Sequence, residues 1–218
     1  MFCEKKLKSC RDYKDGTRVP GNYTVVDKNG NPYQVFCDFN KNYGANTWTL
    51  IQSYSLENKN GFASPFTMDN PRNEDNFTWI DYRLSVERMT YIHEQSVKWR
   101  ITCNYGTEGS LYNDYVRALI ADVPLFTLFT NQGKCVPVQR ISIRGKTCIN
   151  CKAYMVQSYE LPLHFRAKQS NQCNFKVPQT QSCPPESEDN FGNYNCINPK
   201  HKCSSSSSAT TQTWLGGY

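Results

Sequence analysis

The fold class is decided by a stretch near the start of the chain: YTVV at residues 23–26, KNGNP at 28–32 and YQVFC at 33–37. The outer two runs are rich in β-branched and aromatic residues, which are typical of strands. The middle run contains Asn29-Gly30, which suits a turn that needs positive φ. The stretch therefore predicts a β-hairpin.

The same pattern continues along the chain. Ser85 has the position of a helix N-cap, because Val86, Met89 and Ile92 follow at helical spacing. Residues 53–80 are loop-like. Further strands are expected at 48–52, 97–103, 114–120, 125–129, 141–144, 153–156 and, closing the chain, 210–215.

These elements predict an α+β fold: a mixed, mostly antiparallel β-sheet with few short helices and a loop-rich, disulfide-clamped C-terminal region. Residues 1–218 are expected to form one domain, since no repeat or linker divides them. Its expected parts are a disulfide-bracketed β subdomain (9–60), a central sheet and helix (61–157), a loop-rich ligand or ion subdomain (158–203) and a closing strand (204–218).

Composition narrows the function classes. The 218 residues carry a net charge of +6, but the basic residues are spread along the chain, unlike those of a dedicated nucleic-acid domain. Mean hydropathy is −0.69, and no apolar run approaches the ~20 residues of a membrane span. Residues 2–8 lack the apolar core of a signal peptide, so Met1 is interpreted as the start of a fragment.

Eleven cysteines are the strongest compositional signal, and they favour an oxidising, extracellular compartment. Sequons at Asn22 and Asn76 agree with this and predict N-glycosylation there. Cys10 and Cys37 bracket the first hairpin and are expected to pair. The odd count leaves one thiol, and Cys3 at the terminus is the candidate for a free thiol or an interchain disulfide.

The motif Cys148-x-x-Cys151 has three interpretations. With Cys173 and Cys183 it has the first half of a zinc knuckle, but the second half is not C-x-x-C, and no histidine stands at ligand spacing. It can also be a redox motif, although no βαβ pattern surrounds it. The compartment and the cysteine count favour disulfides, either between these two cysteines or to distant partners.

Four segments in order resemble the start of a fibrinogen-related domain: SCRD at 9–12, GNYTV at 21–25, QVFCD at 34–38 and WTLIQ at 48–52. This is the family of the globular heads of fibrinogen chains, ficolins and tachylectin-type lectins. The similarity extends more faintly through 81–89, 99–101 and 114–118, and covers roughly residues 9–130.

The sequence of the last third departs from the pattern of this family. This departure suggests a divergent member or a relative such as the intelectin type. The resemblance implies a calcium loop, which here corresponds to Glu188, Asp189, Asn190 and Gly192, with Glu186 as a further carboxylate; the alternative is an exposed acidic turn without an ion. Asp69, Asn73, Glu74 and Asp75 form a second oxygen-rich loop, for which a solvated loop is the favoured interpretation. Cys183 and Cys196 are expected to pair.

A sugar site needs converging polar groups and an aromatic platform. The candidate ligand-binding residues all lie in the last third: Phe191, Tyr194, Asn195, Cys196 and His201. Packing over a disulfide explains Tyr194 equally well, and Trp214 is expected in the core.

The sequence thus predicts a secreted or cell-surface recognition module that binds glycans or extracellular proteins, with calcium as an open question. A matrix, coat or adhesion component without a sugar pocket is the alternative. A secreted hydrolase is a third, less favoured reading, because the common catalytic motifs are absent from the sequence and no catalytic residues are nominated.

Overall fold

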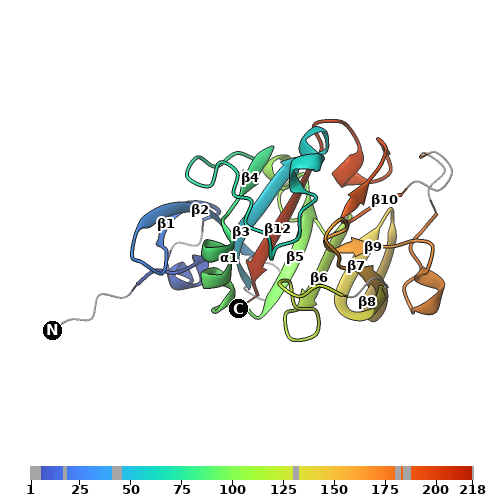
Figure 1. Cartoon of the computed structure of the whole chain (residues 1–218), viewed down its shortest axis with the longest axis horizontal. Helices are drawn as coiled ribbons and strands as arrows, with labels where there is room; N and C mark the ends of the chain where they lie inside the picture. Colours follow the sequence, from blue (N-terminus) through green and yellow to red (C-terminus); the bar gives the residue numbers. More distant parts are fainter. Residues whose placement is uncertain are drawn as a thin grey trace.

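A ten-stranded sheet forms the centre of the computed structural model, which describes residues 6–16, 19–40, 46–129, 133–179, 183 and 188–217 (Figure 1). Its order is β1-β2-β3-β12-β5-β6-β7-β8-β9, with β4 beside β3, and neighbours pair antiparallel. The predicted α+β class is confirmed. The strands are β1 (Gly21–Val26), β2 (Pro32–Asn40), β3 (Asn46–Ser55), β4 (Asp81–Arg83), β5 (Lys98–Cys103), β6 (Tyr115–Leu119), β7 (Lys134–Ile143), β8 (Lys146–Val156), β9 (His164–Phe165), β10 (Asp189–Asn190), β11 (Asn193–Tyr194) and β12 (Thr210–Gly216).

The helices are short. The only α-helix of two turns in the described residues is α1 (Val86–His93), which begins directly after Ser85, as predicted. The others are α2 (Tyr105–Glu108) and the 3-10 helices η1 (Cys10–Tyr13), η2 (Leu56–Phe62), η3 (Ser170–Gln172) and η4 (Lys202–Ser204).

The predicted closing strand is correct, and its place is the middle of the sheet. Strand β12 lies between β3 and β5, with Thr213 opposite Gln52 on one side and Ile101 on the other (Figure 1). Trp214 on this strand is fully buried, as expected. The sheet is therefore continuous only when the end of the chain is in place.

The core on either side of β12 is aromatic and contains one charged pair. Trp48, Trp99 and Trp214 are all less than 2% exposed. The Arg100 guanidinium lies 4.6 Å from the ring centres of both Trp48 and Trp214, and its Nη2 is 2.6 Å from Asp38 Oδ2. A buried arginine with a carboxylate partner and two aromatic faces is the arrangement in which such a charge is tolerated.

The strand predicted at residues 125–129 is wrong. Carbonyl groups of this segment accept hydrogen bonds from one side chain, not from a neighbouring strand. Gln157 Nε2 donates to the carbonyls of Pro124, Leu125 and Thr127. The amide of Phe129 donates to the carbonyl of Gln157 at 2.7 Å. Because these backbone groups already have hydrogen-bond partners, the apolar run is buried without pairing with a neighbouring strand.

Strands expected at 141–144 and 153–156 belong to one long hairpin, β7–β8. Its turn, Arg144-Gly145, has φ values of 47° and 81°, the combination of a type I′ turn. Beyond β8, the described residues from 157 to 209, here called the C-terminal loop region, contain only two-residue strands and two 3-10 helices. As predicted, regular elements become scarce there.

Candidate functional site

Disulfides attach the C-terminal loop region to the sheet. Cys103 at the end of β5 is bonded to Cys203 in η4, and Cys135 of β7 is bonded to Cys173. Cys183–Cys196 closes a loop within the region. These bridges fix the irregular backbone in three places.

The two pairings expected from the sequence, Cys10–Cys37 and Cys183–Cys196, are both present. Cys148 and Cys151 form a local bridge, so the ten described cysteines are all disulfide-bonded and none of them is a zinc ligand. Cys3 lies outside the described residues.

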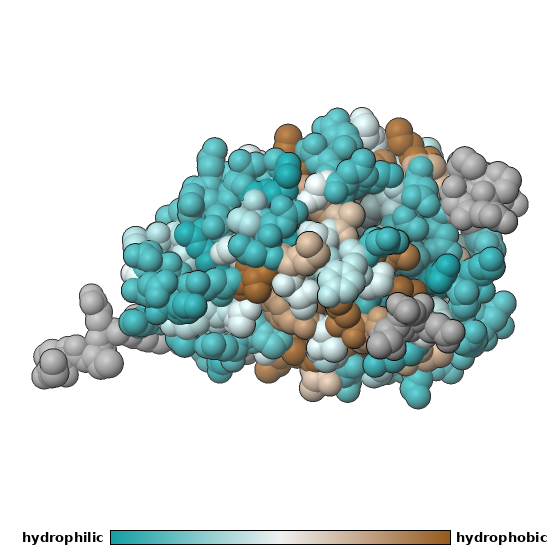
Figure 2. All heavy atoms as spheres, in the orientation of Figure 1, coloured by the Kyte–Doolittle hydropathy of each residue, from teal (hydrophilic) through white to brown (hydrophobic). Residues whose placement is uncertain are grey.

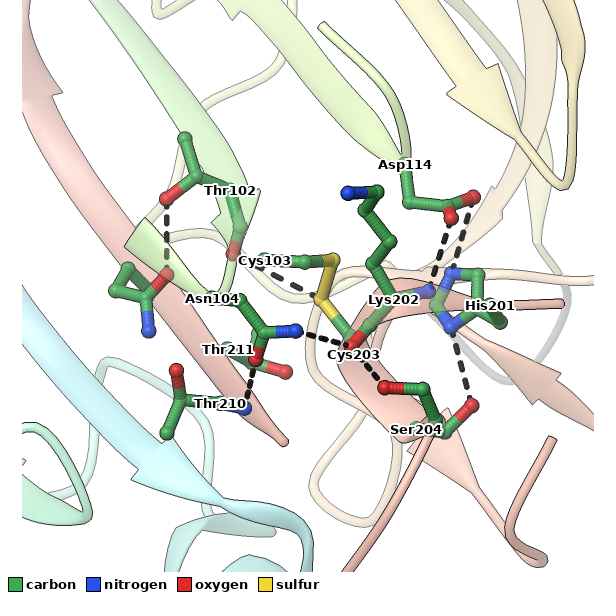
Figure 3. Close-up of a disulfide and its surroundings, with 12 residues drawn as sticks. Thr102, Cys103, Asn104, Asp114, His201, Lys202, Cys203, Ser204, Thr210 and Thr211 are labelled. Carbon is green, nitrogen blue, oxygen red and sulfur yellow. Dashed lines mark hydrogen bonds and ion pairs between the residues drawn. A yellow bond between two sulfur atoms is a disulfide. The ribbon is translucent and has the colours of Figure 1, made fainter. Parts of the chain in front are cut away.

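Asp114 and His201 form a buried corner next to the Cys103–Cys203 bridge (Figure 3). Asp114 accepts hydrogen bonds from the backbone amides of Arg144 at 2.6 Å and Lys202 at 2.9 Å. Its Oδ1 lies 3.7 Å from His201 Nε2, and His201 Nδ1 lies 3.2 Å from Ser204 Oγ. The aspartate therefore joins the β7–β8 turn to η4.

His201 is a neutral imidazole at physiological pH. Burial lowers its pKa to about 3, and the positive charge of Arg144 acts in the same direction. Burial also raises the pKa of Asp114, against the two backbone hydrogen bonds that it accepts. His201 is thus an internal packing group and does not face a ligand in solvent.

An arginine stands beside two of the residues expected to bind calcium. Arg144 Nη1 lies 2.8 Å from Asp189 Oδ1 and 3.0 Å from Asn190 Oδ1, and it also contacts the Asp189 carbonyl. Asn198 donates to the other carboxylate oxygen of Asp189. Burial raises the pKa of Asp189, and Arg144 opposes that rise. The guanidinium supplies the positive charge that these oxygens require.

Glu188 points away from Asp189 and toward β9. Its Oε1 accepts from the Ala167 amide at 3.1 Å, and its Oε2 is 2.7 Å from His164 Nε2. Burial alone would raise its pKa, but the hydrogen bond and charge of His164 and the backbone hydrogen bonds of Ala167 and Lys168 together outweigh burial, and the pKa is lowered. Glu188 is therefore engaged in holding β9 to β10.

Gly192 has a steric role in the β10–β11 turn. Its φ is +80°, and a Cβ added there would lie 2.3 Å from the carbonyl oxygen of Pro162. The fourth residue of the expected calcium set thus permits a close approach of two backbones.

Within the described part of the chain, no three His, Cys, Asp or Glu side chains gather as a metal site. Glu186 lies outside that part. Calcium at residues 188–192 remains a prediction, and the contacts of these residues are explained without it.

The second oxygen-rich loop, residues 69–75, provides carboxylates to the start of helix α1. Asp69 Oδ1 accepts from the amide of Val86 and Glu74 Oε2 from that of Ser85, both at 2.8 Å. Asp75 pairs with Arg88 at 2.7 Å. The carboxylates thus cap the first turn of α1, where the Ser85 side chain makes no capping hydrogen bond.

Three of the five predicted sugar-binding residues are buried, and the other two are at least partly exposed. Phe191, Tyr194 and His201 pack together, with ring centres 5.4 Å apart for Phe191–His201 and 5.6 Å for Tyr194–His201. Asn195 is exposed, and Cys196 is half-buried in its disulfide. Of these residues, Tyr194 and Asn195 are part of the lining of one cavity.

That cavity has a volume of about 140 Å³ and lies where the C-terminal loop region meets β3, β5 and β12. Tyr54 and Phe62 form part of its wall, with stacked rings whose centres are 4.8 Å apart. Lys59 borders it and donates to the carbonyl of Tyr194. The remaining polar lining includes Asn60, Glu160, Asn193 and Asn195.

Lys59, Asn60 and Glu160 were not among the residues nominated from the sequence. Lys59 and Asn60 lie in the 3-10 helix η2, and Glu160 lies in a loop. Neither segment has a periodic pattern, and their meeting at one cavity is visible only in three dimensions. No signal in the sequence pointed to them, since residues 59–62 contain one asparagine and residues 160–163 contain none.

Both sequon asparagines are exposed, Asn22 on β1 and Asn76 in the loop before β4. No described helix is long and apolar enough to cross a membrane.

Neither the protein-family models nor the curated proteins contain a match to this chain. The resemblance to fibrinogen-related domains therefore remains an expectation from the quoted segments.

Proposed function

We propose that this chain is an extracellular recognition module that binds a terminal sugar, or a side chain of comparable size, in the cavity beside Asn195. The five disulfides are consistent with an oxidising compartment. The resemblance to lectin-containing fibrinogen-related domains supports the glycan over other small ligands.

The observation that carries the proposal is the composition of the cavity wall. An aromatic pair, Tyr54 and Phe62, is combined with four carboxamides, at Gln52, Asn60, Asn193 and Asn195. Sugars offer apolar C–H faces and hydroxyl groups, which aromatic rings and amides respectively satisfy.

The volume limits the ligand. Pockets for drug-sized molecules measure about 300–1,000 Å³, whereas this cavity measures about 140 Å³. It accommodates one substituent or the edge of one ring, and the rest of a ligand would lie over the exposed rim at Asn195. On the face shown in Figure 2, hydrophilic residues surround a central group of hydrophobic ones.

A glycan array tests the proposal, with the wild type and Asn195→Ala compared in calcium and in chelator. We expect binding to a restricted set of glycans and a loss of about tenfold or more for Asn195→Ala, because an unpaired ligand hydroxyl costs 1–3 kcal/mol. Asn171→Ala, which changes an exposed asparagine in η3, is the matched control and should bind as wild type.

Equal binding by Asn195→Ala and wild type would exclude this cavity. A flat array in both conditions would reject the lectin proposal and favour the adhesion or matrix alternative, which a screen for extracellular protein ligands addresses. A loss of signal with chelator would instead support calcium. The hydrolase reading has less support, since none of the ten described cysteines is free to act as a nucleophile.

A further inference from the structure

The Cys148–Cys151 bridge differs from the other four disulfides in position and exposure. Its cysteines are three positions apart in sequence, whereas the other separations are 13, 27, 38 and 100 positions. Both of its cysteines are half-buried, with the exposed Ile149 and Asn150 between them. Each of the other bridges contains at least one buried cysteine. This bridge joins no distant segments, so its role is local.

The bridge bends a strand. Both cysteines belong to β8, and residues three apart in an extended strand are separated by about 10 Å. The Cα atoms of Cys148 and Cys151 are only 6.2 Å apart. Asn150 provides the bend through a left-handed backbone, with φ of 49°. A regular strand and this disulfide cannot coexist.

Strand β7 already has the register against β8 that a straight β8, without the disulfide, would require. Val138 is opposite Cys151 and Arg140 is opposite Ile149, so the same antiparallel register holds on both sides of the bend. Within these fully described strands, Gln139 and Asn150 lie opposite one another and are the pair missing from the ladder. Asn150 can therefore become extended when the bridge opens, without any slip of β7 against β8.

Of the two cysteines in this bridge, Cys151 borders a surface cavity. A surface cavity of about 370 Å³ is lined by Cys151, together with Asn150, Pro137, Gln139, Lys152 and Asn174, and Cys148 is not part of this lining. Lys152, which follows Cys151 in the chain, is exposed and adds a positive charge to this lining, and the exposed Asp122 adds a negative one. Attack on a disulfide requires access to a sulfur atom, and a nearby cation favours an incoming thiolate.

We propose that Cys148–Cys151 is a thiol-exchange site that takes a small anionic thiol, such as glutathione, at Cys151. The glutathione thiolate attacks Cys151 Sγ, forming a glutathione–Cys151 disulfide as the Cys148–Cys151 bond breaks. Cys148 leaves as a thiolate and takes a proton from water. A second glutathione thiolate then attacks the glutathione sulfur, which releases Cys151 as a thiolate and yields oxidised glutathione.

The exchange would change the surface at one end of the cavity. Opening the bridge frees Asn150 to leave its left-handed conformation and straightens the exposed edge formed by residues 148–151. Because the other four bridges hold the sheet and the C-terminal loop region, the rest of the fold is expected to keep its structure.

Titration of the Cys3→Ser chain with graded reduced glutathione tests this directly, since the substitution removes the eleventh thiol. After acid quenching, free thiols are alkylated and peptides are mapped by mass. We expect Cys148–Cys151 to open at a glutathione concentration about tenfold or more below that needed for any other bridge, with the mixed disulfide on Cys151.

Two variants separate the sulfurs. Cys148→Ser leaves a free thiol at Cys151 and should acquire one glutathione from oxidised glutathione, whereas Cys151→Ser, the matched control, should react about tenfold more slowly at Cys148. Opening of Cys135–Cys173 or Cys183–Cys196 at equal or lower glutathione would overturn the proposal. So would a mixed disulfide on Cys148. If a cysteine variant fails to fold, the glutathione titration of the Cys3→Ser chain, which keeps all ten described cysteines, still tests the proposal.

Discussion

The sheet and the C-terminal loop region are stabilised by different interactions. The sheet buries large apolar side chains, among them Trp48, Trp99 and Trp214. The loop region buries three phenylalanines, Phe165, Phe175 and Phe191, together with a larger set of polar side chains that are each at most 1% exposed: His164, Asp189, Asn190, Asn198 and His201. Its backbone forms two-residue strands and depends on cross-links to the sheet.

The difference shows where each region is vulnerable. An apolar core spreads its free energy over many contacts, so one lost contact is partly compensated by its neighbours. A region fixed by a few ion pairs and disulfides loses a large share of its stability with any one of them. The proposed binding cavity lies on the boundary between the two regions, with walls from both.

Removal of Cys103–Cys203 is expected to have the largest effect. This bridge closes a loop of 100 residues and joins β5 to η4. In the chain-entropy model such a loop contributes about 4.7 kcal/mol to the free energy of unfolding, close to the lower limit for the whole of a native protein. We expect Cys103→Ser/Cys203→Ser to lose about that amount in urea unfolding.

Cys148→Ser/Cys151→Ser is the matched control, because its loop spans only three residues. The same model gives about 2 kcal/mol for so short a loop. Equal losses for the two double variants would contradict the view that Cys103–Cys203 supports the loop region through its long span.

Replacement of Arg144 should destabilise the loop region selectively. Arg144→Met leaves Asp189 buried without its ion-pair partner, a change that typically costs 3–5 kcal/mol. Hydrogen exchange is expected to accelerate in residues 188–198, whereas amides of β3 and β5 should stay protected. Arg144→Met/Asp189→Asn should recover part of the loss, since the second substitution removes the unpaired charge.

Lys146→Met, at the exposed start of β8, is the control and should leave the exchange pattern unchanged. Uniform acceleration across the sheet in Arg144→Met would show that the two regions unfold together, and the comparison between them would fail.

The buried His201 should give the stability of the protein a specific pH dependence. Its pKa is about 3 in the folded protein, against an ordinary value of 6.5. Between these values the unfolded chain binds a proton that the folded chain does not, so stability falls as the pH is lowered below 6.5. At pH 5 the loss is about 2 kcal/mol, from ~1.4 kcal/mol per pKa unit.

His201→Gln should remove this slope between pH 7 and pH 5 in urea unfolding measured at several pH values. His93→Gln, which changes a half-buried histidine on α1, should retain most of it. An unchanged slope in His201→Gln would mean that other groups account for the acid sensitivity.

Most of the sheet could be predicted from the sequence, because runs of β-branched and aromatic residues between turn signals are typical of strands. The hairpin at residues 23–37 and the closing strand before the terminus were located from such runs, and the helix after Ser85 was located from the helical spacing of its apolar residues. The failure at residues 125–129 has a physical reason: an apolar run shows that a segment is buried, but not that its carbonyls will bond to Gln157 instead of a strand.

The loop region could be predicted only in outline. That Asp189 meets Arg144 depends on contacts across 45 residues, which no local pattern encodes. A row of acidic and amide residues was therefore interpreted as an ion site, although the charge opposite two of them comes from the protein itself. The disulfide Cys183–Cys196 could be predicted because the resemblance implies a cysteine pair at about this spacing, and the two cysteines are 13 positions apart.

The smallest effect is expected at the carboxylate that caps α1, on the sheet side of the comparison. Asp69→Ala removes the acceptor of the Val86 amide and should cost about 1 kcal/mol, the usual value for a lost cap, in urea unfolding. Asp69→Asn keeps an oxygen in the same place without the charge, and asparagine caps a helix about as well as aspartate. We therefore expect Asp69→Asn to be close to wild type. If both variants are destabilised equally, the charge of Asp69 is what matters, and the acidic loop before α1 has to be re-examined as a cation site.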